Sequence, residues 1–146
     1  MKYFFISFCF LLSINANAQL MKVSDMVKQV FDKQYPEAKE VDWKAGLDNH
    51  AVTFKLNDKK YKALYTKDGS WVSTETAVVF ENLPKSVQLS FGASNYKTWT
   101  VKECFEIIKP RAEANEYKIL VQKSSINKKI LFFDAKGRLY EEFRSL

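Results

Sequence analysis

The chain has 146 residues, of which 23 are basic and 17 acidic, so its formal net charge at pH 7 is +6. The lysines are spread along the chain among acidic residues, whereas nucleic-acid binding needs a concentrated basic stripe, so we expect no nucleic-acid partner. The one histidine and two cysteines are too few for the usual zinc or disulfide frameworks.

The first 18 residues predict a secretory signal peptide. Lys2 precedes an apolar run from Tyr3 to Leu12, and Ala16-Asn17-Ala18 supplies the small residues that a signal peptidase reads, so cleavage is expected before Gln19. The run is well short of the roughly 20 residues of a spanning helix, so we predict no membrane span. Removal of residues 1–18 leaves 128 residues with a net charge of +5, enough for one compact exported domain.

The first half of the remaining chain predicts a helix and four strands. Ser24 and Asp25 can cap a helix whose apolar residues recur every three or four positions until Pro36 ends it. Alternating apolar and polar residues then predict strands over 40–44 and 50–56. A hairpin follows over 60–76, and its turn centres on Gly69, because glycine adopts left-handed dihedrals without a Cβ clash.

The second half predicts the same order of elements. A short helix begins at Leu83-Pro84 and stops at Gly92. A long strand over 98–109 breaks strict alternation around residues 102–104, which indicates a β-bulge. A strand over 116–123 and a terminal hairpin over 129–144 complete the set. Cys104 lies in the long strand and is expected to be a small buried apolar residue, since Cys9 leaves with the signal peptide and no partner remains.

Matching positions suggest that the two halves are related. Val27 and Phe31 precede Val87 and Phe91 by 60 residues, whereas Gly69 precedes Gly137 by 68. The second half therefore has eight more residues between its helix and its final hairpin, which is consistent with the longer strand over 98–109. The sequence therefore predicts an α+β fold of two tandem helix-plus-four-strand repeats, residues 22–80 and 81–146 in outline. They would form an antiparallel sheet with both helices packed on one face, leaving the other face open.

Several short motifs in fixed order resemble the PepSY-like family of exported bacterial proteins. They are Tyr35-Pro36-Glu37-Ala38, Val41-Asp42-Trp43, Lys67-Asp68-Gly69-Ser70-Trp71, Thr74-Glu75 and Leu83-Pro84, in a chain that starts with a signal peptide. That family is similar to beta-lactamase inhibitory protein, and the resemblance spans nearly all of residues 19–146. It implies an antiparallel sheet with helices on one face, a periplasmic location in a Gram-negative bacterium, and an inhibitor-like binding role.

The polar residues do not form a catalytic constellation. His50 has no second histidine or free cysteine within motif spacing, so a structural or solvent-facing role is favoured over a metal site. Asp68, Glu75 and Asp134 lie at or beside turns without the alternating acids of a calcium loop. Ser70 and Ser73 have no base nearby in the sequence. We therefore predict a protein that is not an enzyme and needs no metal or cofactor.

The aromatic content suggests a binding surface. Most of the rings, Phe105 and Phe132 among them, fall on apolar periods and are expected in the core. Tyr140 and Phe133 lie opposite in phase to their neighbours, as Leu64 does to Tyr65, so each is either buried under a helix or displayed on the open face. Our leading hypothesis is a non-catalytic module that binds an exported protein, such as a hydrolase, through that face. The predicted partner-binding residues are Trp71, Tyr140 and Leu64, with Lys62 and Lys118 as rim charges.

Two further hypotheses stay open at this point. The alternative is a periplasmic carrier of a small apolar ligand, held in a crevice between helices and sheet beside Phe91 and Tyr96. A hydrolase of unrecognised type is the third.

Overall fold

A computed structural model describes residues 22–145 of the chain. The predicted signal peptide and its cleavage point lie outside the described residues. Within residues 22–145 no helix has both the length and the apolar character needed to cross a bilayer.

The described residues form helices and strands in the predicted order. The first half contains α1 (Asp25–Gln34), β1 (Lys39–Lys44), β2 (Asn49–Leu56), β3 (Lys59–Thr66) and β4 (Trp71–Val78). The second half contains the 3₁₀ helix η1 (Phe80–Asn82), α2 (Lys85–Ala93), β5 (Thr100–Ile108), β6 (Glu116–Ser124), β7 (Asn127–Phe133) and β8 (Leu139–Ser145).

All eight strands belong to one antiparallel sheet, in which each strand pairs with the next along the chain. The halves meet where β4 pairs with β5, from Thr74 opposite Ile108 to Val78 opposite Cys104. This confirms the predicted antiparallel sheet and the α+β class. The predicted bulge is also present, since the register of β5 against β6 shifts between Val101 and Glu103.

Both helices pack on the same face of this sheet. Val27 and Phe31 of α1 are buried against Val52 and Ala63, while Val87 and Phe91 of α2 are buried with a second set of residues. That set includes Cys104, Ile119, Val121 and Leu131. Directly opposed residues share a face, so the pairs Ala63–Thr74 and Val78–Cys104 place both cores on one side of β4.

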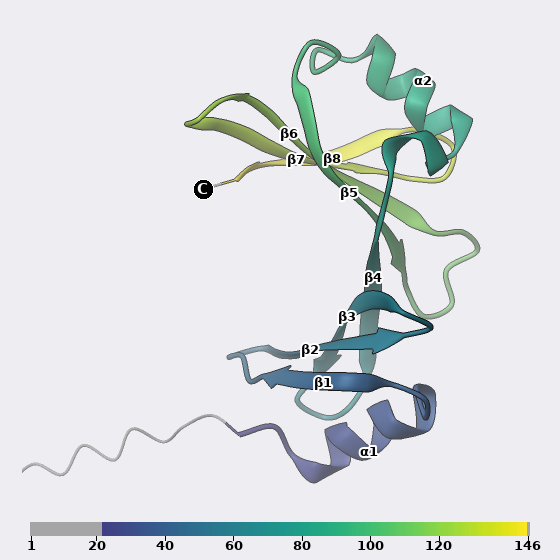
Figure 1. The fold of residues 1–146 in the computed structure, drawn as a ribbon, viewed down its shortest axis with the longest axis vertical. Helices are drawn as coiled ribbons and strands as arrows, with labels where there is room; N and C mark the ends of the chain where they lie inside the picture. The colour runs from purple at the N-terminus through teal and green to yellow at the C-terminus, as the bar shows by residue number, and fades with distance from the viewer. Residues whose placement is uncertain (1–21, 146) are drawn as a thin grey trace, which may run out of the picture.

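The sheet is curved around its other face. The two helices lie at opposite ends of the longest axis of the molecule, with the strands between them (Figure 1). Because both helices cover the same face, the sheet must curl away from them, and the uncovered face turns inward. We call this uncovered side, which carries Leu64, Glu75, Ile107, Lys118 and Phe132, the open face.

The helix boundaries follow the sequence signals with one exception. Ser24 caps α1, and its hydroxyl oxygen accepts a hydrogen bond from the backbone N–H of Val27 at 3.4 Å. Pro84 is the N-cap of α2, one position before the first helical residue, Lys85. Gly92, however, does not stop α2, which continues to Ala93. The end comes at Ser94, whose backbone N–H and hydroxyl both donate to the carbonyl oxygen of Phe91.

The β3–β4 and β7–β8 turns have the same backbone hydrogen bonds. In the first, Thr66 N–H donates to Ser70 O at 2.9 Å and Gly69 N–H to Thr66 O at 3.1 Å. In the second, Asp134 N–H donates to Arg138 O at 3.1 Å and Gly137 N–H to Asp134 O at 3.0 Å. Each glycine has a φ of 87°, the left-handed conformation that the sequence predicted.

The added residues of the second half are shared between strand and loop. β5 has nine residues and β1 has six, so the longer strand accounts for only three of them. The connection over 109–115 is three residues longer than that over 45–48, and single residues before β5 and in β6 supply the rest. The longer fifth strand is therefore present as predicted, and the connection after it contributes an equal number of the added residues.

Candidate functional site on the open face

A shallow groove of about 270 Å³ crosses the open face from β3 to β8. Its lining includes Leu64 of β3, Glu75 of β4, Ile107 of β5, Lys118 of β6, Phe132 of β7 and Tyr140 of β8. Alternation along β3 to β7 brings their side chains to one side. On β8 the register shifts, so that Tyr140 and its neighbour Glu141 both line the groove. The groove therefore combines residues from both halves of the chain.

The middle of the groove is an ion pair between the halves. Lys118 Nζ bonds to a carboxylate oxygen of Glu75, and their side chains are only 18% and 21% exposed. The same ammonium lies 4.2 Å from the centre of the Phe105 ring, within the range of a cation–π contact. Such low exposure means that the pair is held against the sheet rather than extended into solvent.

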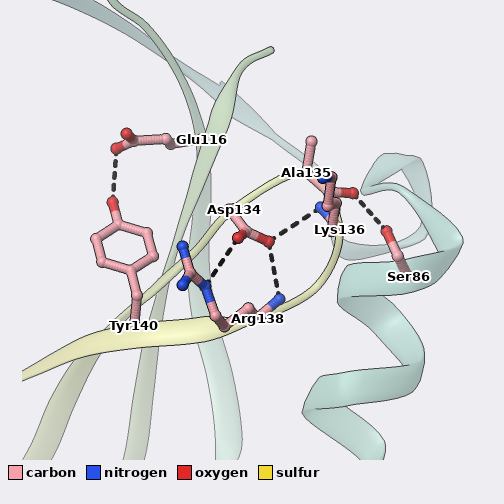
Figure 2. A network of polar contacts seen from close by, with 7 residues as sticks. All are labelled: Ser86, Glu116, Asp134, Ala135, Lys136, Arg138 and Tyr140. Atoms are coloured by element: carbon pink, nitrogen blue, oxygen red, sulfur yellow. Dashed lines mark hydrogen bonds and ion pairs between the residues drawn. The ribbon is translucent and has the colours of Figure 1, made fainter. Parts of the chain in front are cut away.

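Tyr140 and Glu116 form a second polar pair beside the first. The Tyr140 hydroxyl donates to Glu116 Oε2 at 2.5 Å, and Lys109 Nζ lies 2.6 Å from the same oxygen (Figure 2 shows the Tyr140–Glu116 bond). Burial, followed by the neighbouring Glu116 carboxylate, raises the pKa of the Tyr140 phenol above its usual range. Tyr140 therefore stays a hydrogen-bond donor at neutral pH.

The Glu116 carboxyl is ionised in this arrangement. Burial raises its pKa, but the Lys109 ammonium and the Tyr140 hydroxyl outweigh that effect, so the net pKa of Glu116 is lowered. A charged carboxylate therefore orients the Tyr140 ring on the open face.

Aromatic rings extend the groove along β7 and β8. The Phe132 ring centre lies 6.3 Å from that of Tyr140 and 6.0 Å from that of Phe143, and the Phe132–Phe143 pair is edge-to-face. Tyr140 is 40% exposed and Phe143 48% exposed. These three rings, with Phe105, make up what we call the aromatic cluster. They offer a partner a rigid, partly apolar surface.

Three of the five predicted partner-binding residues line this groove together. Leu64, Lys118 and Tyr140 come from three different strands and meet there. Lys118 is not a rim charge, because its ammonium is paired with Glu75 at the centre. Lys62 lies opposite Glu75 in the β3–β4 ladder and lines an adjacent groove of about 470 Å³ over β1 to β5.

Trp71 lies apart from the other four. Its ring packs against the α1 core and its Nε1–H donates to Thr74 Oγ1 at 3.0 Å. Thr74 is itself buried on the helix-covered side and bonds to the Tyr35 hydroxyl at 2.7 Å. Trp71 is therefore placed on the face opposite the groove.

Two phase assignments made from sequence are corrected on β7 and β5. Phe132, assigned to the core, faces the groove, whereas Phe133, for which burial under a helix and display were both open, is completely buried under α2. Phe105, also assigned to the core, lies on the open face, and its neighbour Cys104 is buried instead. Every second residue of a strand points the same way, so apolar neighbours cannot be told apart without the register.

Sequence reasoning also missed the acidic partners of the groove. Glu75 was interpreted as an acid beside a turn, but it lies inside β4, opposite Ile107. Glu116 received no role. Both pair with cations from other strands, and no local pattern in the sequence signals such contacts.

The described residues contain no group of three or more His, Cys, Asp and Glu side chains that could hold a metal ion. Cys104 is buried, as predicted, and burial raises the pKa of its thiol to about 11, with Glu81 adding to the effect. The thiolate is scarce at neutral pH, so Cys104 is not primed as a nucleophile.

The side chains beside the crevice of the ligand-carrier alternative are packed. Phe91 is 6% exposed and contacts the Phe80 ring edge-on, with ring centres 5.3 Å apart. Tyr96 packs edge-on against Trp99 at 5.2 Å. Both belong to the core that α2 covers.

Solved structures with the same fold come from Bacteroides species. A crystal structure described among "putative periplasmic proteins" from Bacteroides eggerthii has a TM-score of 0.76 and 22% identity, covering 84% of this chain and 89% of the other. A DUF2874 family protein from Bacteroides uniformis has a TM-score of 0.77 and 20% identity, with coverages of 84% and 90%. A BLIP-like protein from Bacteroides fragilis has a TM-score of 0.73 and 22% identity, with coverages of 86% and 89%.

No protein-family model and no curated protein matches the chain. At these identities the structural matches show a shared fold. The fold shared with a BLIP-like protein agrees with the similarity to beta-lactamase inhibitory protein that the sequence resemblance implied.

Proposed function

We propose that the protein is an exported, non-catalytic binding module that engages another periplasmic protein through its open face. The observation that carries this proposal is the aromatic cluster, which lies on an inward-curved sheet face around two ion pairs. Partly exposed rings in a polar surround supply much of the energy of protein interfaces. Residues from both halves contribute, so a partner would contact the groove on both sides of the β4–β5 pairing, which we call the joint.

The neighbouring structures add an argument from likeness. One of them is described as BLIP-like, and the motifs of this chain resemble the PepSY-like family, which is similar to beta-lactamase inhibitory protein. On that analogy the partner is an exported enzyme such as a hydrolase, and binding to it is inhibitor-like. We also propose that residues 22–80 and 81–146 are tandem repeats, because both contain a helix followed by four strands and the same glycine turn.

Within the groove we assign contact roles to Leu64, Lys118 and Tyr140, and an outer role to Lys62. The Tyr140 hydroxyl would donate to the partner, or to the partner and Glu116 together, while Leu64 would make apolar contacts with the partner. Trp71 would support β4 from the other side, so replacing it is expected to alter stability more than binding.

Affinity capture from periplasmic extract tests the proposal. The bait is the chain from residue 19 onward, and the matched variants are Tyr140→Ala with Phe143→Ala on the open face and Leu89→Ala on the exposed side of α2. We expect the wild type and Leu89→Ala to retain the same exported protein, identified by mass spectrometry at physiological salt. The double variant should lose it by about tenfold or more, because each ring is expected to contribute over about 1 kcal/mol.

Circular dichroism would show that each bait is folded. Equal capture by the double variant and the wild type would remove the open face as the binding site. Capture lost equally in Leu89→Ala would assign binding to the helix-covered side instead.

A further inference from the structure

A second hollow lies on the other side of the molecule, beside the first turn of α1. It has a volume of about 290 Å³ and is lined by Lys22, Ser24, Gly46, His50 and Lys67. These residues precede α1, occupy the β1–β2 loop, start β2 and follow β3. The lining therefore includes two lysines and, among the described residues, no acid.

His50 is a buried polar side chain in this lining. It is 5% exposed, and its Nδ1 is buried and hydrogen-bonds to none of the described residues. A buried ring nitrogen without a partner costs free energy and is rare in native structures. Nδ1 itself is shielded from the hollow, so a ligand there would contact another atom of the ring. His50 also faces the core side of β2, opposite Tyr65, so the ring cannot turn outward without leaving the sheet.

The start of α1 provides further hydrogen-bond donors. Ser24 is the N-cap, and its hydroxyl satisfies the Val27 amide, while the amides of Asp25 and Met26 have no acceptor within the helix. The helix dipole adds a partial positive charge at the same place. Helix N-termini of this kind bind phosphate groups in many proteins.

Gly46 brings the β1–β2 loop close to the hollow. A Cβ atom on Gly46 would lie 2.3 Å from the carbonyl oxygen of Asn49, so another residue would force the loop to move. Lys67 reaches the same place from the β3–β4 turn, whose backbone hydrogen bonds fix its position. Three separate segments thus converge on the first turn of α1.

We propose that this hollow binds a phosphate-class oxyanion, either free or as the phosphate group of a small ester. Lys22 and Lys67 would neutralise its charge, and His50 and the first-turn amides would donate to its oxygens. The volume equals that of roughly ten water molecules, which leaves room for a small organic group beside the phosphate. This site is separate from the open-face groove, and it requires no partner protein.

Because His50 is the one histidine in the sequence, its ring gives a single set of imidazole signals in ¹H–¹³C correlation spectra. The protein is titrated with inorganic phosphate and, separately, with glycerol 3-phosphate, at constant pH and ionic strength. Sodium chloride is the reference salt. We expect a saturable shift of the His50 ring signals that chloride does not reproduce.

Charge-neutral variants identify the ligand-binding lysines. Lys67→Gln and Lys22→Gln should each weaken binding by about tenfold, the effect of one charge-assisted hydrogen bond. The matched control is Lys136→Gln, which removes the same charge from the β7–β8 turn and should leave binding unchanged.

A saturable shift with either phosphate compound supports the site and shows whether free or esterified phosphate is preferred. The absence of a shift with both compounds would overturn the proposal. An equal loss of affinity in Lys136→Gln and Lys67→Gln would also overturn it, because binding would then reflect net charge alone.

Discussion

The two halves of the molecule use aromatic residues on different faces. In the first half the rings gather under α1, where Phe31 contacts four others. These partners are Tyr35, Trp43, Phe54 and Tyr65. On the open face the same half presents lysine, threonine and serine side chains around Leu64. The second half presents the aromatic cluster there.

This difference separates stability from recognition. Rings enclosed under α1 contribute to the folding free energy of the first half and are inaccessible to a partner. The rings of Phe132, Tyr140 and Phe143 on the open face stay partly exposed, and so contribute less to folding and more to any interface. The first half therefore keeps its rings on the helix-covered side, whereas the second half has rings both under α2 and on the open face.

Truncating the equivalent helix phenylalanines should show the largest effect. Phe31→Ala is expected to lower the free energy of unfolding by about 5 kcal/mol and Phe91→Ala by about 3 kcal/mol, the two ends of the range for buried phenylalanine. Phe31 is in contact with four rings, whereas Phe91 is paired with Phe80 alone. Urea unfolding measures both. A larger loss of unfolding free energy in Phe91→Ala than in Phe31→Ala would mean that the core under α2 is the better packed of the two.

The glycines of the two turns should differ in a second test. A Cβ on Gly137 would lie 2.4 Å from the Ser86 backbone oxygen, while one on Gly69 would meet Val30 at an ordinary 3.5 Å. Ser86 Oγ also donates to Ala135 O at 2.7 Å, which fixes the β7–β8 turn against α2 (Figure 2). Both alanine variants carry left-handed strain of about 1 kcal/mol.

Gly137→Ala should lose about 2 kcal/mol more than Gly69→Ala, because the clash involves backbone rather than a flexible side chain. The comparison uses the urea midpoints of both variants at one pH. Equal midpoints would mean that α2 can move away from the turn at little cost.

The ion pair across the joint tests how strongly the halves are coupled. A double-mutant cycle with Glu75→Gln and Lys118→Met should give a coupling free energy of about 1 kcal/mol, since both side chains are largely shielded. The control cycle uses Glu40→Gln and Lys55→Met, a more exposed pair within the first half, and should give less than about 0.5 kcal/mol. Equal coupling free energies in both cycles would show that the shielding of the Glu75–Lys118 pair does not strengthen it.

The smallest expected effect is the loss of stability at low pH through the turn residues Asp134 and Asp68. The pKa of Asp134 is lowered first by the Arg138 backbone N–H and then by the Arg138 side chain, and the pKa of Asp68 is lowered chiefly by the Thr66 hydroxyl. The folded state favours the ionised form of both. Their contribution is therefore complete above the ordinary value of 3.8 and is lost as pH falls through the lower folded pKa.

Urea midpoints measured between about pH 5 and pH 2 should fall with acid, and the fall should be shallower in Asp134→Asn than in Asp68→Asn. Asp134 has the additional ion pair with Arg138, at 3.1 Å, which motivates that order (Figure 2). Identical pH profiles for wild type and Asp134→Asn would remove this carboxylate from the acid response.

The amino-acid sequence by itself determined most of the local structure. The Ser24 cap and the three-and-four spacing of Val27 and Phe31 set α1, and Gly69 and Gly137 set the turns, because these signals act over a few residues. Hydrophobic alternation gave the strands, and their short connections gave the antiparallel order of the sheet. The matching order of elements in the two halves was also readable from the spacing.

Only the tertiary structure decided which side chains meet on the open face. Phe132 and Phe133 are equally apolar, and one step in register exchanges the face on which each lies. The pairing of Glu75 with Lys118 spans 43 positions, and no local pattern encodes a contact at that separation. Trp71 was predicted to bind a partner on the open face, but the register shift between Leu64 and Tyr65 aims it at the α1 core. The register of a sheet is set by all the residue pairs between its strands together, so the contacts that depend on register are fixed only when the sheet is assembled.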